Sequence, residues 1–221
     1  MRSVAAVAFI CAASLAAHTG AQANKPTSAR LRAGATAPVA PPLTVGGGEV
    51  ILDVTVGKDG TVSKVQPVRG TPPYTQLLTS AVGGWGFDPA KSLVEDALQA
   101  AESHVLVAAV YRPPQVYAAP APGAETKTVG ELSAQLPSPG ALTMPTAYPP
   151  RAVRDGTVVI ELELGIGGVV QGAKVMSGPS PFDNPALDTA RGWRFGVPRD
   201  PTGAEQIFVY AVVGFREPIT Q

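Results

Sequence analysis

The chain has 221 residues, of which 45% are hydrophobic and only 15% are charged, and it contains 24 glycines and 23 prolines. That length holds one ordinary domain or two small ones, because domains usually have roughly 100 to 150 residues. Its 17 basic residues balance 17 acidic ones, which argues against nucleic-acid binding and against attraction to an anionic membrane surface.

The N-terminus has the layout of a secretory signal peptide. Residues 4–17 are apolar, and Ala23 ends a segment of the A-x-A type that precedes cleavage sites. We therefore predict a signal peptide over residues 1–23 and a mature chain that begins near Asn24. The apolar stretch is shorter than the roughly 20 residues that span a bilayer, but its retention as an anchor stays open. Cys11 is the only cysteine, so a cleaved chain would hold no disulfide.

Two similar patterns of β-strands follow. Residues 24–40 come first and are rich in Ala, Pro and Thr without apolar periodicity, which indicates a flexible stalk. From Gly48 the segment GEVILDVTV alternates apolar and polar residues, and GKDG predicts a turn into a returning strand. From Gly156 the segment GTVVIELEL repeats this pattern, so two hairpins are expected.

The two patterned units are copies of one another. A shift of 108 residues makes 13 of the 50 positions between residues 41 and 90 identical. Both tryptophans of the chain, Trp85 in GWGF and Trp193 in GWRF, fall on such positions. A short helix is predicted before each one, with Thr75 and Asp183 as N-caps and a glycine at the end. We therefore predict an internal duplication in which each tryptophan packs where the chain leaves its helix.

The predicted organisation has five parts. They are a signal peptide over residues 1–23, a flexible stalk over 24–40, a first domain over 41–114, a linker rich in Pro and Ala over 115–147, and a second domain over 148–221. The fold class that we expect is α+β. Each of the two small domains should contain a short antiparallel sheet, made of a hairpin and a last strand, with one or two short helices.

The second unit also carries an ordered series of motifs: a Tyr-Pro opening, a glycine in the hairpin turn, Ser-Gly, a helix, then Trp-Arg-Phe and Pro. In this order the unit resembles the TonB C-terminal domain family. The matching positions are Tyr148, Pro149, Ala152, Gly156, Val158, Gly168, Val170, Ser177, Gly178, Asp183, Ala186, Trp193, Arg194, Phe195 and Pro198. Phe182 stands where the family usually has Leu. The first unit looks like a degenerate copy, since Gly86 replaces the arginine of Trp-Arg-Phe.

The resemblance implies a periplasmic protein-interaction module. Members of the family pass energy from an inner-membrane motor to outer-membrane transporters, whose extended segment adds to the edge of the domain's sheet. The partner-binding residues implied here are Phe208, Val209, Tyr210, Ala211, Val212 and Val213 of the last strand, together with Arg194. This strand contains no Pro or Lys, so at an edge its backbone groups could template another strand.

Several alternatives stay open. The last strand is equally compatible with a covered or central position, and the two units could pair through their edges into one continuous sheet without a free template. A soluble periplasmic adaptor or envelope-assembly protein that keeps the fold without energy transduction is the functional alternative. We expect a protein partner, no nucleic acid, and contact with a membrane only if the N-terminal segment is retained as an inner-membrane anchor facing the periplasm.

The sequence offers little for catalysis. His104 is the only histidine of the mature chain and is expected to be structural. Glu161 and Glu163 share one strand face, as Asp53 and Thr55 do, and strand alternation predicts these side chains to be exposed to solvent. GKDG and GIGG lack the following helix and lysine of a phosphate-binding loop. We therefore expect no enzymatic activity, no cofactor and no metal.

Overall fold

The computed structural model describes residues 25–41, 44, 46–114, 126–204 and 206–218. The signal peptide predicted over residues 1–23 lies outside the described residues.

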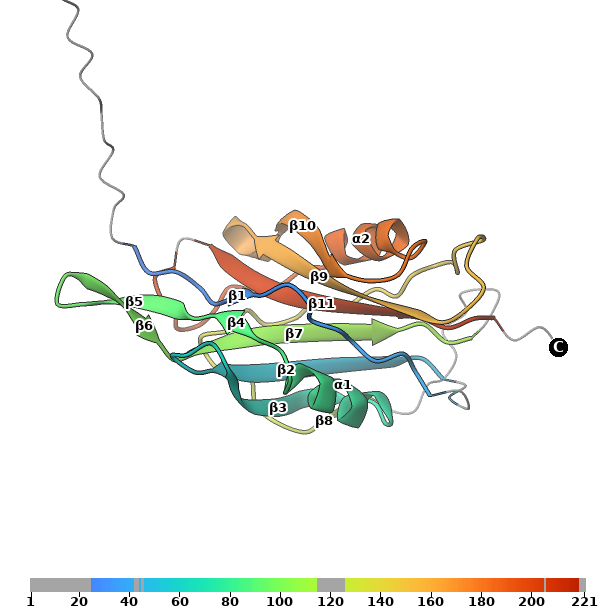
Figure 1. Cartoon of the computed structure of the whole chain (residues 1–221), viewed down its shortest axis with the longest axis horizontal. Coiled ribbons are helices and arrows are strands. Elements are labelled where there is room, and N and C mark those ends of the chain that lie inside the picture. Colours follow the sequence, from blue (N-terminus) through green and yellow to red (C-terminus); the bar gives the residue numbers. More distant parts are fainter. Residues whose placement is uncertain (1–24, 42–43, 45, 115–125, 205, 219–221) are drawn as a thin grey trace, which may run out of the picture.

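Each half of the chain forms a hairpin, a helix and a last strand, in the order that the sequence predicts (Figure 1). In the first half they are β2 (Gly48–Val56), β3 (Val62–Gly70), α1 (Tyr74–Val82) and β7 (Ser103–Tyr111). In the second half they are β9 (Gly156–Leu164), β10 (Val170–Ser177), α2 (Asp183–Arg191) and β11 (Ile207–Phe215), with the 3-10 turn η1 (Ile166–Gly168) between β9 and β10. The smaller elements are β1 (Arg30–Leu31), β4 (Phe87–Asp88), the hairpin of β5 (Ala90–Val94) and β6 (Ala97–Ala101), and β8 (Lys127–Thr128).

The helix starts differ from the prediction. Phe182, rather than Asp183, is the N-cap residue of α2, and in α1 this position is held by Pro73 rather than Thr75; neither cap makes a side-chain hydrogen bond. The position of α2 is set by tertiary packing, because the Phe182 ring lies against the backbone of Gly156, where a β-carbon would come within 2.3 Å of it.

The predicted fold class, α+β with two small domains that each have their own sheet, is wrong. The described residues form one seven-stranded mixed sheet in the order β10-β9-β11-β7-β2-β3-β8, not two separate small domains. The two halves join through β7 and β11, which pair in parallel from Leu106 with Val209 to Tyr111 with Gly214. The structure is 42% strand and 12% helix, so it is mostly β.

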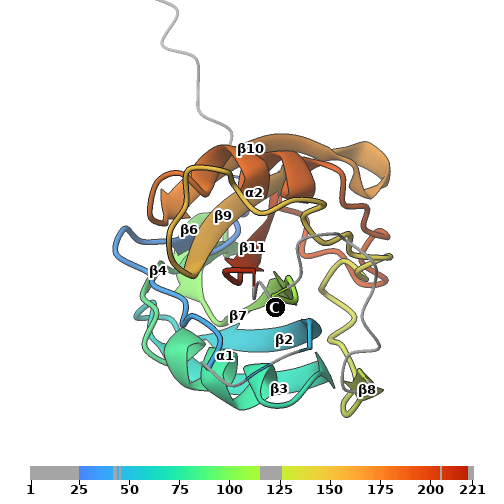
Figure 2. The same ribbon diagram turned by 90° about the vertical axis from the view of Figure 1, so that its right-hand side faces the viewer.

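The helices of the two halves cover opposite faces of this sheet. Leu78 of α1 belongs to the same hydrophobic cluster as Tyr210, whereas Ala186 of α2 belongs to the cluster that contains Val209. Successive residues of a strand point to opposite faces, so successive residues of β11 belong to the hydrophobic clusters of different helices. Figure 2 shows the result, with α1 beside β2 and β3 and α2 beside β9 and β10.

Two extended segments cover the parts of the two sheet faces that the helices do not cover. The N-terminal strap, residues 25–41, crosses the α1 face over the second half, where the Thr157 hydroxyl donates to the carbonyl of Pro38 at 3.1 Å. The central strap, residues 126–148, crosses the α2 face over the first half and places Leu136 in the core. The flexible stalk predicted over 24–40 is therefore a packed segment from residue 25 on, and so is the described part of the predicted linker.

Candidate functional site

The residues predicted to bind a partner by strand addition lie in the middle of the sheet. Phe208, Val209, Tyr210, Ala211, Val212 and Val213 are all buried. Their strand, β11, pairs with β9 on one side and with β7 on the other. Of the arrangements left open by the sequence, the continuous sheet is the one observed. Strand addition at β11 would require this strand to separate from a neighbour.

Arg194, the other predicted partner-binding residue, lies at the end of α2. Its side chain is exposed, and its guanidinium donates to the carbonyls of Arg191, Gly192 and Trp193 at 3.3, 3.2 and 2.8 Å. Arg194 thus satisfies carbonyl groups that the helix end leaves without an intrahelical donor. The structure does not bring it together with β11 through any hydrogen bond among the described residues.

The two tryptophans fasten the straps to the sheet. The indole N–H of Trp85 donates to the carbonyl of Thr36 at 2.9 Å, and that of Trp193 donates to the carbonyl of Thr143 at 3.0 Å. Both rings are buried. Each tryptophan therefore joins a helix end to the segment that precedes its own half, which confirms the predicted packing role and adds a specific hydrogen bond.

Two carboxylates at equivalent positions of the duplication are buried, not exposed as predicted. Asp53 is 6% exposed and Glu161 is 5% exposed. The prediction fails because each strap covers a strand face that the alternation pattern assigns to solvent. Burial of a carboxylate requires compensating partners, and the two carboxylates find them in different residues.

Glu161 binds the N-terminal strap. Arg30 donates through Nε and Nη2 to its two oxygens, at 3.0 and 2.5 Å, and the Tyr210 hydroxyl donates to the same carboxylate at 3.3 Å. The Arg30 guanidinium also stacks over the Phe208 ring, 3.9 Å from its centroid. The hydrogen bond to Glu161 raises the pKa of Arg30, which favours the charged guanidinium in this contact.

Asp53 binds the central strap and the only histidine among the described residues. One oxygen lies 2.6 Å from His104 Nδ1, and the other accepts the backbone N–H of Ser133 at 3.0 Å. A buried carboxylate that orients an imidazole is also part of many catalytic sites. Here, however, no described hydroxyl is hydrogen-bonded to the ring, so a paired nucleophile is not formed. The contacts tie β2, β7 and the central strap together.

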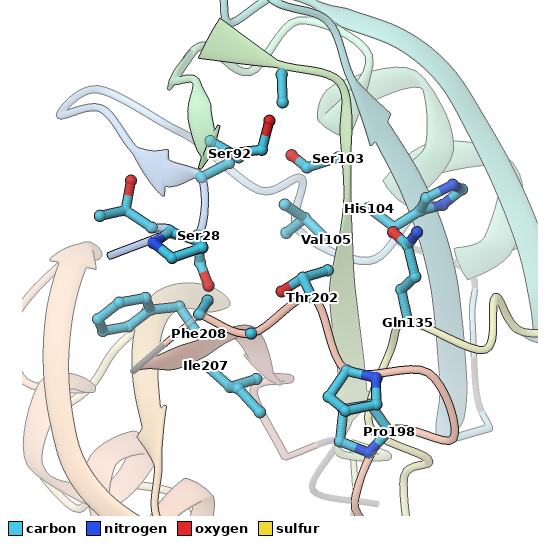
Figure 3. A pocket seen from close by; sticks show the side chains of 18 of the residues that line it. Ser28, Ser92, Ser103, His104, Val105, Gln135, Pro198, Thr202, Ile207 and Phe208 are labelled. Atoms are coloured by element: carbon cyan, nitrogen blue, oxygen red, sulfur yellow. The ribbon is translucent and has the colours of Figure 1, made fainter. Parts of the chain in front are cut away.

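A cavity of about 340 Å³ lies at the end of the sheet where β7 and β11 begin (Figure 3). Side chains from both straps, from the β5–β6 hairpin and from the segment before β11 line it, among them Ser28, Ser92, Gln135 and Thr202. Ser103 Oγ is buried without a hydrogen-bond partner among the described residues. The volume suits a small ligand, but the mixture of prolines, hydroxyls and apolar side chains does not select one chemical class.

Comparisons with protein-family models, with curated proteins and with solved structures found no match to this chain. In the part of the chain that the structure describes, no helix has the length and apolar character needed to cross a membrane. Within the same residues, no three or more His, Cys, Asp or Glu side chains are grouped so that they could hold a metal ion.

Proposed function

We propose that the protein is a periplasmic adaptor, a protein-interaction module that resembles a tandem pair of TonB C-terminal domains and uses their last strands to join each other. The observation that carries this proposal is the parallel pairing of β7 with β11. In a domain of this kind the last strand would otherwise be the template for a transporter segment. Here that template is occupied by the other half, which favours an adaptor over energy transduction.

The core composition supports a permanent union of the halves. The strands β7 and β11 bury residues on both faces, and all residues of Val105–Tyr111 and Phe208–Phe215 are buried. Separation would expose two rows of backbone groups and two apolar faces to water, at a cost of roughly 25 cal/mol for each Å² of apolar surface. The N-terminal strap adds to this union, because Arg30 and Leu31 bind the second half and the first half respectively.

Transport coupling by strand addition at β11 is the second candidate function, favoured by the motif order around Trp193. It predicts that β11 leaves β7 to accept a transporter segment. The two functions therefore differ in whether the sheet opens between its halves.

A disulfide across the two halves separates these functions. Ala108 and Ala211 are direct neighbours on β7 and β11 and belong to the same hydrophobic cluster, and neighbouring strands lie about 4.8 Å apart, within the range of disulfide geometry. We would titrate the Ala108→Cys/Ala211→Cys variant, oxidised and reduced, with extended peptides from outer-membrane transporters. The amides of β11 should stay unchanged in both states.

The single variant Ala108→Cys serves as the control for the substitution itself. If the β11 amides shift in the reduced protein and stay fixed in the oxidised protein, the sheet opens, and the adaptor proposal is wrong.

A further inference from the structure

β3 and β10 are equivalent strands in the duplication but differ in whether a further segment of the chain pairs with their outer edge. β3 and β10 are related by the offset of 108 residues, and they pair with β2 and β9 in matching register. Pro67 lies opposite Leu52, and its counterpart Val175 lies opposite Ile160. The two edges are therefore equivalent positions, and they can be compared residue by residue.

The edge of β3 is closed by the chain itself. β8 pairs with Arg69 and Gly70 as an antiparallel strand, and the backbone N–H groups of Val129 and Gly130 donate to the carbonyl of Val68 at 2.9 and 3.3 Å. Pro67 also removes one N–H group from this strand, a common way to protect an edge. The contact is close, since a β-carbon on Gly130 would come within 2.6 Å of the Pro67 carbonyl.

The edge of β10 has no such cover in the part of the chain that the structure describes. β10 is the terminal strand of the sheet order, and Figures 1 and 2 show it at the rim of the molecule. It contains no proline, and Val175 and Met176 are only partly buried. Lys174 is exposed and lies opposite Glu161 of β9, whose carboxylate is bound by Arg30, and no ion pair of the Lys174 side chain is present among the described residues. An uncovered edge of this kind can template a further strand.

We propose that β10 binds an extended segment of a partner protein as an eighth, antiparallel strand, with an acidic residue of that segment beside Lys174. This inference rests on the adaptor function proposed above and names its binding surface. The molecule supplies the precedent, because residues 126–130 add to the equivalent edge of β3 in this manner. The acidic residue follows from charge complementarity, since opposite charges on neighbouring strands attract.

The test uses a probe taken from the protein. The peptide TKTVGELS copies residues 126–133, which begin with the segment that covers β3. On β3, a β-carbon added to Gly130 would lie 3.3 Å from the side-chain nitrogen of Gln66, the counterpart of Lys174. The glutamate that follows this glycine in the peptide would thus come to lie near Lys174. Titration of the full chain with the capped peptide, followed by NMR, should shift the amides of β10 and leave those of β11 unchanged.

Two variants check the geometry. Val175→Pro copies onto β10 the proline that β3 already has at the equivalent position, so the fold and the binding of the peptide should both tolerate it, as the edge of β3 accepts residues 126–130 beside Pro67. Lys174→Glu should weaken binding of TKTVGELS by roughly two- to fivefold and strengthen binding of the lysine peptide TKTVGKLS by a similar factor. This exchange of preference does not depend on the proline variant.

Each outcome decides the proposal. It is wrong if the β10 amides do not shift, if only β3 amides shift, or if Lys174→Glu leaves the preference between the two peptides unchanged. It is also wrong if β10 amides shift with protein concentration in the absence of peptide, because the edge would then bind a second copy. Shifts confined to β11 would instead refute the adaptor function, so the two failures can be told apart.

Discussion

Replacement of Trp193 by Phe tests whether the indole hydrogen bonds of the two tryptophans hold the straps against the helix ends. The substitution keeps an aromatic ring in the core but removes the indole N–H that donates to the Thr143 carbonyl at 3.0 Å. Trp85→Phe is the matched change in the other half, because its N–H donates to Thr36 at 2.9 Å.

The expected cost follows from these contacts. Loss of one hydrogen bond contributes about 1 kcal/mol. Trp193 is 0% exposed, so the smaller ring leaves a cavity, which adds roughly 1 to 2 kcal/mol. Trp193→Phe should therefore lower the free energy of unfolding by about 2 to 3 kcal/mol. The cost of Trp85→Phe should be similar, because its ring is only 5% exposed.

Urea denaturation followed by circular dichroism measures this free energy, and limited proteolysis under native conditions locates the effect. Trp193→Phe should speed cleavage in the central strap, and Trp85→Phe should speed cleavage in the N-terminal strap. A cost below about 1 kcal/mol, or equal protection of both straps in both variants, would show that the indole hydrogen bonds do not hold the straps.

Three further predictions concern groups inside the fold. Burial raises the pKa of Tyr111, so its ionisation favours the unfolded chain: stability is full below the unfolded pKa of about 10 and falls as pH rises above it. Since the Tyr111 hydroxyl has no hydrogen-bond partner among the described residues, Tyr111→Phe should leave stability at pH 7 within about 1 kcal/mol and reduce its loss above pH 10 in urea titrations. Glu161→Gln should lower the free energy of unfolding in urea by roughly 1 to 3 kcal/mol, because it removes the charge of the carboxylate that accepts from Arg30, and the Arg30 side chain is itself about half-exposed. An unchanged midpoint would contradict the role of this pair. Gly168→Ala should be far more destabilising than Gly167→Ala by thermal unfolding, since both have positive φ but only at Gly168 would a β-carbon meet a carbonyl oxygen, at 1.7 Å; equal melting temperatures would refute this contact.

Local structure was largely readable from the sequence. Apolar alternation located the hairpins, and the offset of 108 residues between Trp85 and Trp193 revealed the duplication. These features depend on neighbours along the chain, where the side-chain period and the turn residues act directly. The continuous apolar runs in β7 and β11 are a further sequence signal, typical of strands that are buried on both faces.

The contact between the two halves was decided by tertiary structure. The pairing of β7 with β11 joins residues about one hundred positions apart, and an apolar run does not reveal which strand lies beside it. The same holds for the straps, whose Pro- and Ala-rich sequence has no periodicity because it runs as single extended segments over a sheet. Burial of Asp53 and Glu161 follows from the straps, so their partners could not be inferred from strand alternation. The sequence by itself thus determined the repeated unit, and only the tertiary structure decided that two such units complete one sheet, because strand pairing satisfies backbone groups that any sequence carries.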